Sequence, residues 1–495
     1  MIFWFIFSFL LLGIFIYLTV RSSAKMTKTP TWLLWLAFMA PAFLMVAIYT
    51  VKKTQPQELL VWYSIISTLL YWLLFQWGRR AQDNKQKSPT SESKTALKTV
   101  EPKQEIELVR PIEPTEETKL RNCFPWSVYY IHNIEYRPQA VICRGQLRID
   151  PNQAYQNIKA NIEAEFGDRF LLVFQEGMNG KPFFILVPNT QTISGVSLVN
   201  ERLNGLKWAL LLLVMTLFTT TRAGSIIAEG SPTNFDVADP NIFLQGLPYA
   251  LGIITILGTQ ELGHYFGAVY YKIRASLPFF IPIPLFLGTL GAFVQIRSPF
   301  PHRKALFDVN IIGPLAGFFV TIPILFWGLA NSQIVDLTSK ARLFNLDALN
   351  PRDSILLAVL SKLALGSSLT VNSAIDLHPI AIAGLFGLII TALKLMPVGQ
   401  LEGGYIIHAM FGKKTGLIIG QIARLLLLLR ALVWRQTEFF LWAILLLFMP
   451  IIDKPVLNDV TQINNARDMW GLFALTVLIL IVLPLPQSIA YLLKF

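Results

Sequence analysis

The chain has 495 residues, of which 54% are hydrophobic and only 15% are charged. Soluble globular proteins carry about 25% charged residues, so the composition excludes an ordinary soluble enzyme, and it also excludes collagen, a disulfide scaffold and a disordered chain. The net charge is +12, but residues 79–205, the one long polar stretch, hold 17 basic and 15 acidic residues. The basic excess therefore flanks apolar segments, which is typical of a multi-pass membrane protein, and no nucleic acid is expected as a partner.

Three apolar runs open the chain, at residues 2–20, 32–50 and 59–77. Each has about 20 residues, enough to cross roughly 30 Å of hydrocarbon as a helix. The first run lacks the basic start and the small-residue cleavage site of a signal peptide, so it is predicted to remain as a span. Residues 1–80 are therefore interpreted as three N-terminal transmembrane helices.

Residues 81–120 are charged and rich in Pro and Ser, which predicts a flexible linker. Residues 121–200 are predicted to form a small α+β module, with a helix at 152–167 that Asp150 caps and strands at 140–149, 169–176 and 181–189. The module shows no catalytic constellation, so substrate filtering, partner docking and structural support all stay open. Its cysteines, Cys123 and Cys143, lack CxxC spacing and are interpreted as ordinary thiols or as one pair.

Seven further spans are predicted after Gly205, at residues 206–220, 247–271, 309–330, 379–396, 417–433, 439–452 and 472–491. The fold class is therefore an all-α polytopic membrane protein of about ten transmembrane helices, with the α+β module inserted before the later ones. Residues 275–306 contain too much Pro and Gly for a helix, and we expect a re-entrant loop or a membrane-embedded hairpin there.

Basic residues gather at the same ends of several predicted spans: Arg21, Lys25, Lys28, Arg79, Arg80, Lys272, Arg274, Arg303 and Lys304. Positive residues favour the cytoplasmic side, so this pattern places the amino terminus outside and the α+β module on the cytoplasmic side. Lys52 and Lys53 lie on the opposite side of this arrangement.

Ionisable residues inside apolar helices are functional candidates, because they are costly to place in lipid. Glu261 and His264 lie three residues apart in the otherwise apolar segment at residues 256–272 and so share one helix face. A buried pair that merely holds helices together is the alternative. A second polar patch, Lys394 and Glu402, surrounds Pro397, which breaks the preceding helix.

These two segments resemble the motifs of a known family. Residues 260–264, QELGH, resemble the H-E-x-x-H helix of zinc proteases with its first histidine replaced, and residues 394–403, KLMPVGQLEG, resemble the N-x-x-P-x-x-x-L-D-G motif of site-2 proteases. Residues 291–318 and 378–405 resemble the cyanobacterial and chloroplast branch of that family of intramembrane zinc metalloproteases. The similarity covers residues 206–412, and residues 413–495 are interpreted as C-terminal transmembrane helices.

The resemblance implies a zinc cofactor, a general base at Glu261 and zinc ligands at positions 260, 264 and 402. It also implies transmembrane protein substrates or partner membrane proteins in a lipid bilayer, either a bacterial plasma membrane or a thylakoid. The chain departs from the motifs at three places, with Gln260 for His, Lys394 for Asn and Glu402 for Asp. Only His264 and Glu402 remain as good zinc ligands, and Gln260 is a doubtful third.

Three hypotheses follow from these departures. In the first, the zinc site is degraded, Lys394 replaces the metal by pairing with Glu261 or Glu402 within about 4 Å, and the protein binds membrane partners with weak or absent proteolysis. In the second, an active protease holds zinc through His264, Glu402 and either Gln260 or a recruited histidine; the remaining histidines, His132, His302, His378 and His408, are expected to be structural. The third hypothesis is a transporter or channel, whose broken helices and buried charges would be similar.

Overall fold

The computed structural model describes residues 116–137, 140–177, 180–189, 198–229, 240–283, 287–336, 351–366, 373–434 and 456–492, with a few positions elsewhere. The predicted spans at 2–20, 32–50, 59–77 and 439–452 and most of the linker at 81–120 lie wholly or largely outside these residues. The chain divides into two compact units, and everything below concerns the larger one, residues 104–282 and 287–495.

The described part of the chain is mostly helical. Its α-helices are α4 (Glu116–Asn122), α5 (Pro151–Phe166), α6 (Leu198–Glu229), α7 (Pro240–Leu244), α8 (Leu247–Tyr270), α9 (Arg303–Ala330), α10 (Ile355–Leu365), α11 (Pro379–Leu395), α12 (Glu402–Trp434), α14 (Asn465–Val482) and α15 (Gln487–Leu492). Its strands are β1 (Tyr129–Arg137), β2 (Ala140–Leu147), β3 (Phe170–Glu176), β4 (Pro182–Pro188), β5 (Phe279–Pro282), β6 (Thr289–Phe293), β7 (Phe300–His302), β8 (Gln333–Asp336), β9 (Ser373–Asp376) and β10 (Val456–Asn458). Short 3₁₀ turns occupy Gly167–Arg169 and Pro351–Asp353.

The predicted α+β module is present as a sheet with α5 packed on it. Asp150 caps α5 as expected, because its carboxylate accepts hydrogen bonds from the backbone N–H groups of Asn152 and Gln153. The helix buries Tyr155, Ile158 and other apolar residues in a cluster with the sheet. The predicted helix and three strands are confirmed, whereas β1 and α4 were missed, and α4 begins inside the segment predicted to be a linker.

The sheet of the module continues beyond the module's own sequence. Six strands lie in the order β1-β2-β4-β3-β10-β7, and β10 runs parallel to both β3 and β7. Val456 of β10 packs in the core of the helical region, while its neighbour Leu457 packs against the core of the module. Residues 456–458 therefore belong to both, which corrects the interpretation of residues 413–495 as transmembrane helices alone.

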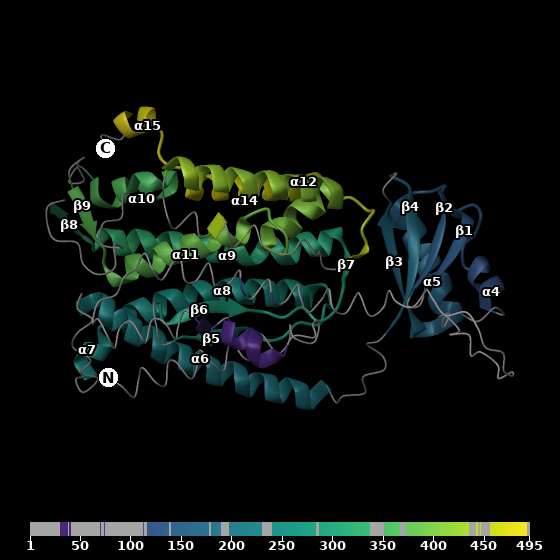
Figure 1. Cartoon of the computed structure of the whole chain (residues 1–495), viewed down its shortest axis with the longest axis horizontal. Helices are drawn as coiled ribbons and strands as arrows, with labels where there is room; N and C mark the ends of the chain where they lie inside the picture. Colours follow the sequence, from purple (N-terminus) through teal and green to yellow (C-terminus); the bar gives the residue numbers. More distant parts are fainter. Residues whose placement is uncertain are drawn as a thin grey trace, which may run out of the picture. The chain divides into compact units, whose positions relative to one another are not determined.

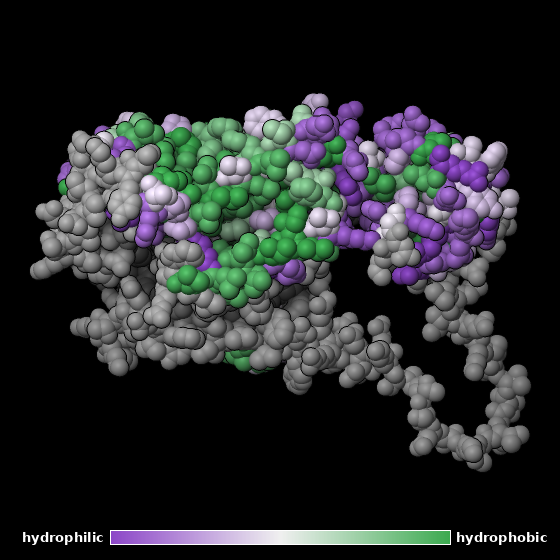
Figure 2. All heavy atoms as spheres, turned by 90° about the horizontal axis from the view of Figure 1, so that it is seen from above, coloured by the Kyte–Doolittle hydropathy of each residue, from purple (hydrophilic) through white to green (hydrophobic). Residues whose placement is uncertain are grey.

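Four helices of the described residues are long and apolar enough to cross a membrane: Gly205–Ala228, Asn241–Tyr270, Arg303–Ala330 and Asn465–Val482. In Figure 2, hydrophobic side chains cover much of the visible face of the helical core, and hydrophilic ones dominate the visible face of the module. Large apolar side chains such as Leu425 and Leu426 of α12 are more than half exposed in the structure. The four spans bear out the membrane class, and the predicted total of about ten is not confirmed.

Several predicted spans differ from the structure in their ends. The span predicted at 472–491 lies earlier in the chain, because α14 runs from Asn465 to Val482 and ends before Pro484 and Pro486, and α15 is a separate short helix. The span at 417–433 is the second arm of α12, which bends at Gly412, where φ is +82°. Residues 275–306 contain the β5–β6 hairpin, as the Pro-rich sequence indicated.

Candidate functional site

The site is built on α8, α9 and α11, which pack side by side in the core (Figure 1). Gln260, Glu261 and His264 lie on the inward face of α8 and are 0%, 2% and 7% exposed. Two glycines of α9 make room for them. A Cβ atom at Gly317 would lie 2.0 Å from Cγ of Gln260, and one at Gly313 would lie 2.2 Å from Nε2 of His264. Neither position therefore accepts a side chain while α8 and α9 keep this spacing.

His264 is held in a fixed orientation by α9. Its Nδ1 lies 2.7 Å from the backbone carbonyl of Val309. A carbonyl oxygen only accepts, so Nδ1 donates this hydrogen bond, and Nε2 is the ring nitrogen that faces Glu402. Nε2 lies 3.5 Å from Oε1 of Glu402 and makes no hydrogen bond within the described residues. In metal sites, a histidine that binds through one ring nitrogen commonly donates from the other to a backbone carbonyl, as His264 does here to Val309.

Gln260 turns its amide toward α11. Its Nε2 donates to the hydroxyl of Thr391 at 3.2 Å. Its Oε1 is buried and has no hydrogen-bond partner in the part of the chain that the structure describes. The amide oxygen of Gln260 and Nε2 of His264 are thus two buried polar atoms without a hydrogen bond in the described part of the chain, at the position where the zinc protease motif has two imidazoles.

Lys394 brings a positive charge into this site from the last turn of α11. Its Nζ donates to Oε1 of Glu261 at 2.6 Å and lies 3.5 Å from Oε1 of Glu402, the first residue of α12. The Lys394 side chain is 14% exposed and that of Glu261 3%. Both distances lie within the 4 Å expected for a lysine that replaces the metal. One ammonium therefore lies between the two carboxylates of the site.

The residues present do not fit a catalytic zinc. Two zinc ligands in tetrahedral geometry lie about 3.3 Å apart, so the 3.5 Å between His264 Nε2 and Glu402 Oε1 would suit one ion. The third donor would be the neutral amide of Gln260, a poor ligand, and the Lys394 ammonium lies equally close to Glu402. Among the described residues, no group of three or more His, Cys, Asp or Glu side chains could hold a metal ion.

The four other histidines lie in structural positions. His302 and His378 accept hydrogen bonds from the first turns of α9 and α11 and act as N-caps. His408 contacts Asp459 through Nε2 at 2.9 Å, and His132 lies in β1. The contacts of His302, His378 and His408 are made outside the group formed by Gln260, His264 and Glu402.

Sequence reasoning missed two residues that shape the site. Thr391 lies three residues before Lys394 on α11, so the helical spacing that brings Lys394 inward could have found it. Val309 contributes only its backbone carbonyl, and no property of its side chain signals this contact.

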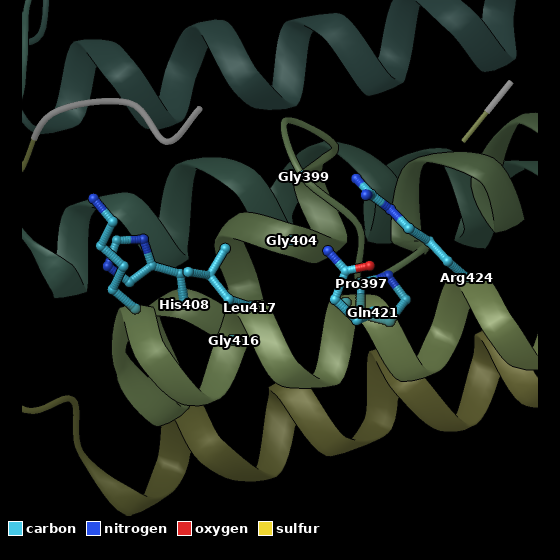
Figure 3. Close-up of a pocket in the computed structure, with 10 residues that line it drawn as sticks. Pro397, Gly399, Gly404, His408, Gly416, Leu417, Gln421 and Arg424 are labelled. Carbon is cyan, nitrogen blue, oxygen red and sulfur yellow. The ribbon is translucent and has the colours of Figure 1, made fainter. Parts of the chain in front are cut away.

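A small pocket lies between the two arms of α12 and the segment that contains Pro397 and Gly399. Figure 3 shows His408 and Leu417 toward one end and Pro397, Gln421 and Arg424 toward the other. Its volume of about 20 Å³ is enough for about one water molecule. The pocket is therefore too small for an organic ligand.

A larger groove lies between α8, α9 and the start of α11. Its volume is about 630 Å³, and its lining is almost wholly apolar: Leu244, Leu247, Pro248, Leu251, Gly252, Thr255, Pro323, Ile324, Trp327 and Ile380. The lining residues of α8 precede Gln260 by roughly one to four helical turns. The same helix therefore carries the groove and the polar site.

Comparisons with known proteins agree with the motifs. Residues 248–431 match the family model described as peptidase family M50, and residues 118–193 match the model described as the EGY3 middle domain. The first match contains all of α9 and α11 and all but the first residue of α8, and the second overlaps the described module. The suspected resemblance to the site-2 protease family is thereby confirmed.

Curated relatives are named as chloroplast proteases. The chain is 33% identical to the probable zinc metalloprotease EGY1 of Arabidopsis thaliana over 49% of the chain and 44% of the relative. It is 29% identical to the EGY2 protein of the same plant over 73% of the chain and 63% of the relative, and 25% identical to its probable zinc metallopeptidase EGY3 over 73% and 65%. The chain thus spans less than two thirds of each of these three relatives. No solved structure matches it significantly.

Proposed function

Because the chain carries a peptidase family M50 domain and is homologous to the chloroplast EGY metalloproteases, we propose that it is a site-2-protease-like membrane protein that binds membrane segments without cutting them. In this proposal Lys394 takes the place of the metal. The observation that carries it is the 2.6 Å contact between Lys394 Nζ and Glu261 Oε1.

Glu261 is the residue that the family motif would use as general base. A general base must be free to accept a proton from water. Here the carboxylate is buried and already accepts a hydrogen bond from an ammonium group. The ammonium also lies beside Glu402, and its positive charge would repel a divalent cation at that position. Both effects argue against hydrolysis and favour a stable ion-pair network of Lys394 with the two carboxylates.

The groove supports binding of a membrane segment. Its volume and apolar lining fall in the range of sites that bury apolar ligands, and it lies along α8 next to the polar site. We propose that a transmembrane segment of a partner protein is its occupant. The membrane would be a bacterial plasma membrane or a thylakoid, with the module on the cytoplasmic side; this sidedness stays a prediction.

One observation favours the altered but active protease as second candidate. Nε2 of His264 and the carboxylate of Glu402 face each other at 3.5 Å, and an ion could join them if Lys394 moved away. Glu261 would then be the base. The peptidase match favours either of these two functions over the transporter or channel.

Metal content of the purified wild-type protein, measured by mass spectrometry without added chelator, tests the proposal. We expect zinc far below one ion per chain and no cleavage of a single-span model membrane protein. Near-stoichiometric zinc, together with chelator-sensitive cleavage that disappears in Glu261→Gln, would establish the active protease instead.

A further inference from the structure

A buried carboxylate outside the site joins two of the elements that build it. Oδ1 of Asp459 lies 2.9 Å from Nε of Arg303 and 2.9 Å from Nε2 of His408. The three residues are 6%, 7% and 4% exposed. A buried charge of this kind is tolerated only when its partners are well placed, so the geometry of the three groups is tightly constrained.

The two partners lie on two helices that shape the site, α9 and α12. Arg303 is the first residue of α9, and Val309, whose carbonyl orients His264, follows it by six residues. His408 lies six residues after Glu402 on the first arm of α12. Six residues of helix rise about 9 Å. Asp459 therefore holds α9 about 9 Å along the helix from Val309, and it holds α12 about 9 Å along the helix from Glu402.

Arg303 also contacts the bend of α12. A Cβ atom at Gly412 would lie 3.2 Å from Nη2 of Arg303. The guanidinium therefore packs directly over the residue where the helix changes direction, and its position depends on Asp459.

Asp459 is itself placed by the soluble module. It follows β10 directly, and its backbone N–H donates to the carbonyl of Phe174 in β3 at 2.9 Å. Leu457 and Val460, on either side, pack against the hydrophobic core of the module. The backbone around Asp459 is thus held by the module, while its side chain holds α9 and α12.

We propose that Asp459 is a positioning residue through which the soluble module sets the spacing between His264 and Glu402. In this proposal the module positions the residues of the site between the helices, in addition to binding any partner. The inference does not depend on the proposed function, because the same spacing would govern binding and hydrolysis alike.

The test reads His264 directly in the full-length protein. The chain has only five histidines, so protein labelled with ¹⁵N-histidine and reconstituted in lipid gives few signals in solid-state NMR, assignable by single substitutions. Asp459→Asn is expected to shift the signals of both His408 and His264 at constant pH, and Asp459→Glu is expected to restore those of His264. Asp150→Asn is the matched control, because it makes the same change at the cap of α5 and leaves His264 unmoved.

A second variant keeps the test decisive if Asp459→Asn does not fold. Leu457→Ser leaves Asp459, Arg303 and His408 intact but loosens the contact with the module, and it should also shift His264. An unchanged His264 signal in folded Asp459→Asn, with only His408 displaced, would overturn the inference, as would an unchanged His264 in Leu457→Ser.

Discussion

At the scale of single residues, Lys394 is the most informative side chain. Removing one partner of a buried ion pair leaves an uncompensated charge and costs about 3–5 kcal/mol. Lys394→Met leaves Glu261 and Glu402 without their cation, and we expect it to lower stability by this amount in a denaturant titration. Lys207→Met, an exposed lysine on α6, is the control and should change stability by less than about 0.5 kcal/mol. Equal effects of the two variants would refute the ion-pair network.

Restoring the two lost motif residues should restore metal binding. Gln260→His supplies the missing imidazole, and Lys394→Asn removes the cation beside Glu402. We expect the double variant to bind close to one zinc per chain and Gln260→His alone to bind less, because the ammonium remains 3.5 Å from Glu402. Gln295→His, which adds a histidine at an exposed position, is the control. Metal analysis that finds no zinc in the double variant would show that the site geometry, and not only its residue types, has diverged.

The cysteines of the module are free and buried, so they are not the pair that the sequence left open. Burial raises the pKa of the Cys143 thiol from 9.0 to about 12. A raised pKa means that the folded state favours the neutral thiol, so stability is complete below pH 9 and falls as pH rises toward 12. We expect alkylation of Cys143 in the native protein to stay slow up to that range, whereas the unfolded chain reacts near pH 9. Rapid native labelling at pH 8 would contradict this burial.

Residue types in the site could be predicted from sequence, because a charge in an apolar run is visible without a structure. Glu261, His264, Lys394 and Glu402 were found in this way, and the structure brings them together; their roles stay predictions. Asp459 could not be found, since it lies in a polar segment where a carboxylate is unremarkable.

At the scale of elements, the bend of α12 is set by one backbone angle. Gly412 has φ of +82° and ψ of 167°, a backbone region that is essentially confined to glycine and costs other residues about 1–3 kcal/mol, and a Cβ atom would also lie 3.2 Å from Nη2 of Arg303. Gly412→Ala is therefore expected to lower stability by at least that amount in thermal unfolding. Gly205→Ala, on α6 with open space around it, should be neutral or slightly stabilising. A neutral Gly412→Ala would mean that the bend can relax.

Helices with strong apolar runs were predictable within a few residues, and their ends were less so. Pro484 and Pro486 ended α14 earlier than expected because the run remains apolar past the break. The α10 helix was missed because its eleven residues are too short to signal a span. Conversely, Asp150 fixed the start of α5 locally, where short-range rules suffice.

At the scale of the whole described molecule, the sheet that joins module and core is the least predictable feature. β10 has three residues, too few for any periodic pattern, and its partners come from distant segments. We expect Asn458→Pro to increase hydrogen exchange in β3 and β7 but not in β1 and β2, because proline cannot donate a hydrogen bond at the residue of β10 that pairs with both strands. Gln462→Pro, in exposed coil nearby, should leave all four strands protected. Exchange confined to residues 456–460 would show that the neighbouring strands do not depend on β10.

The position of β10 also has a consequence for how the protein is made. Its partner β3 leaves the ribosome about 280 residues earlier, which at 5–20 residues per second is a delay of roughly 14–56 s. During that time β3 has an open edge, and every helix from α6 to α12 is synthesised in between. The sheet therefore closes only after the intervening helices have been made. A chaperone that shields this edge during synthesis would act on a transient surface that the finished protein no longer has.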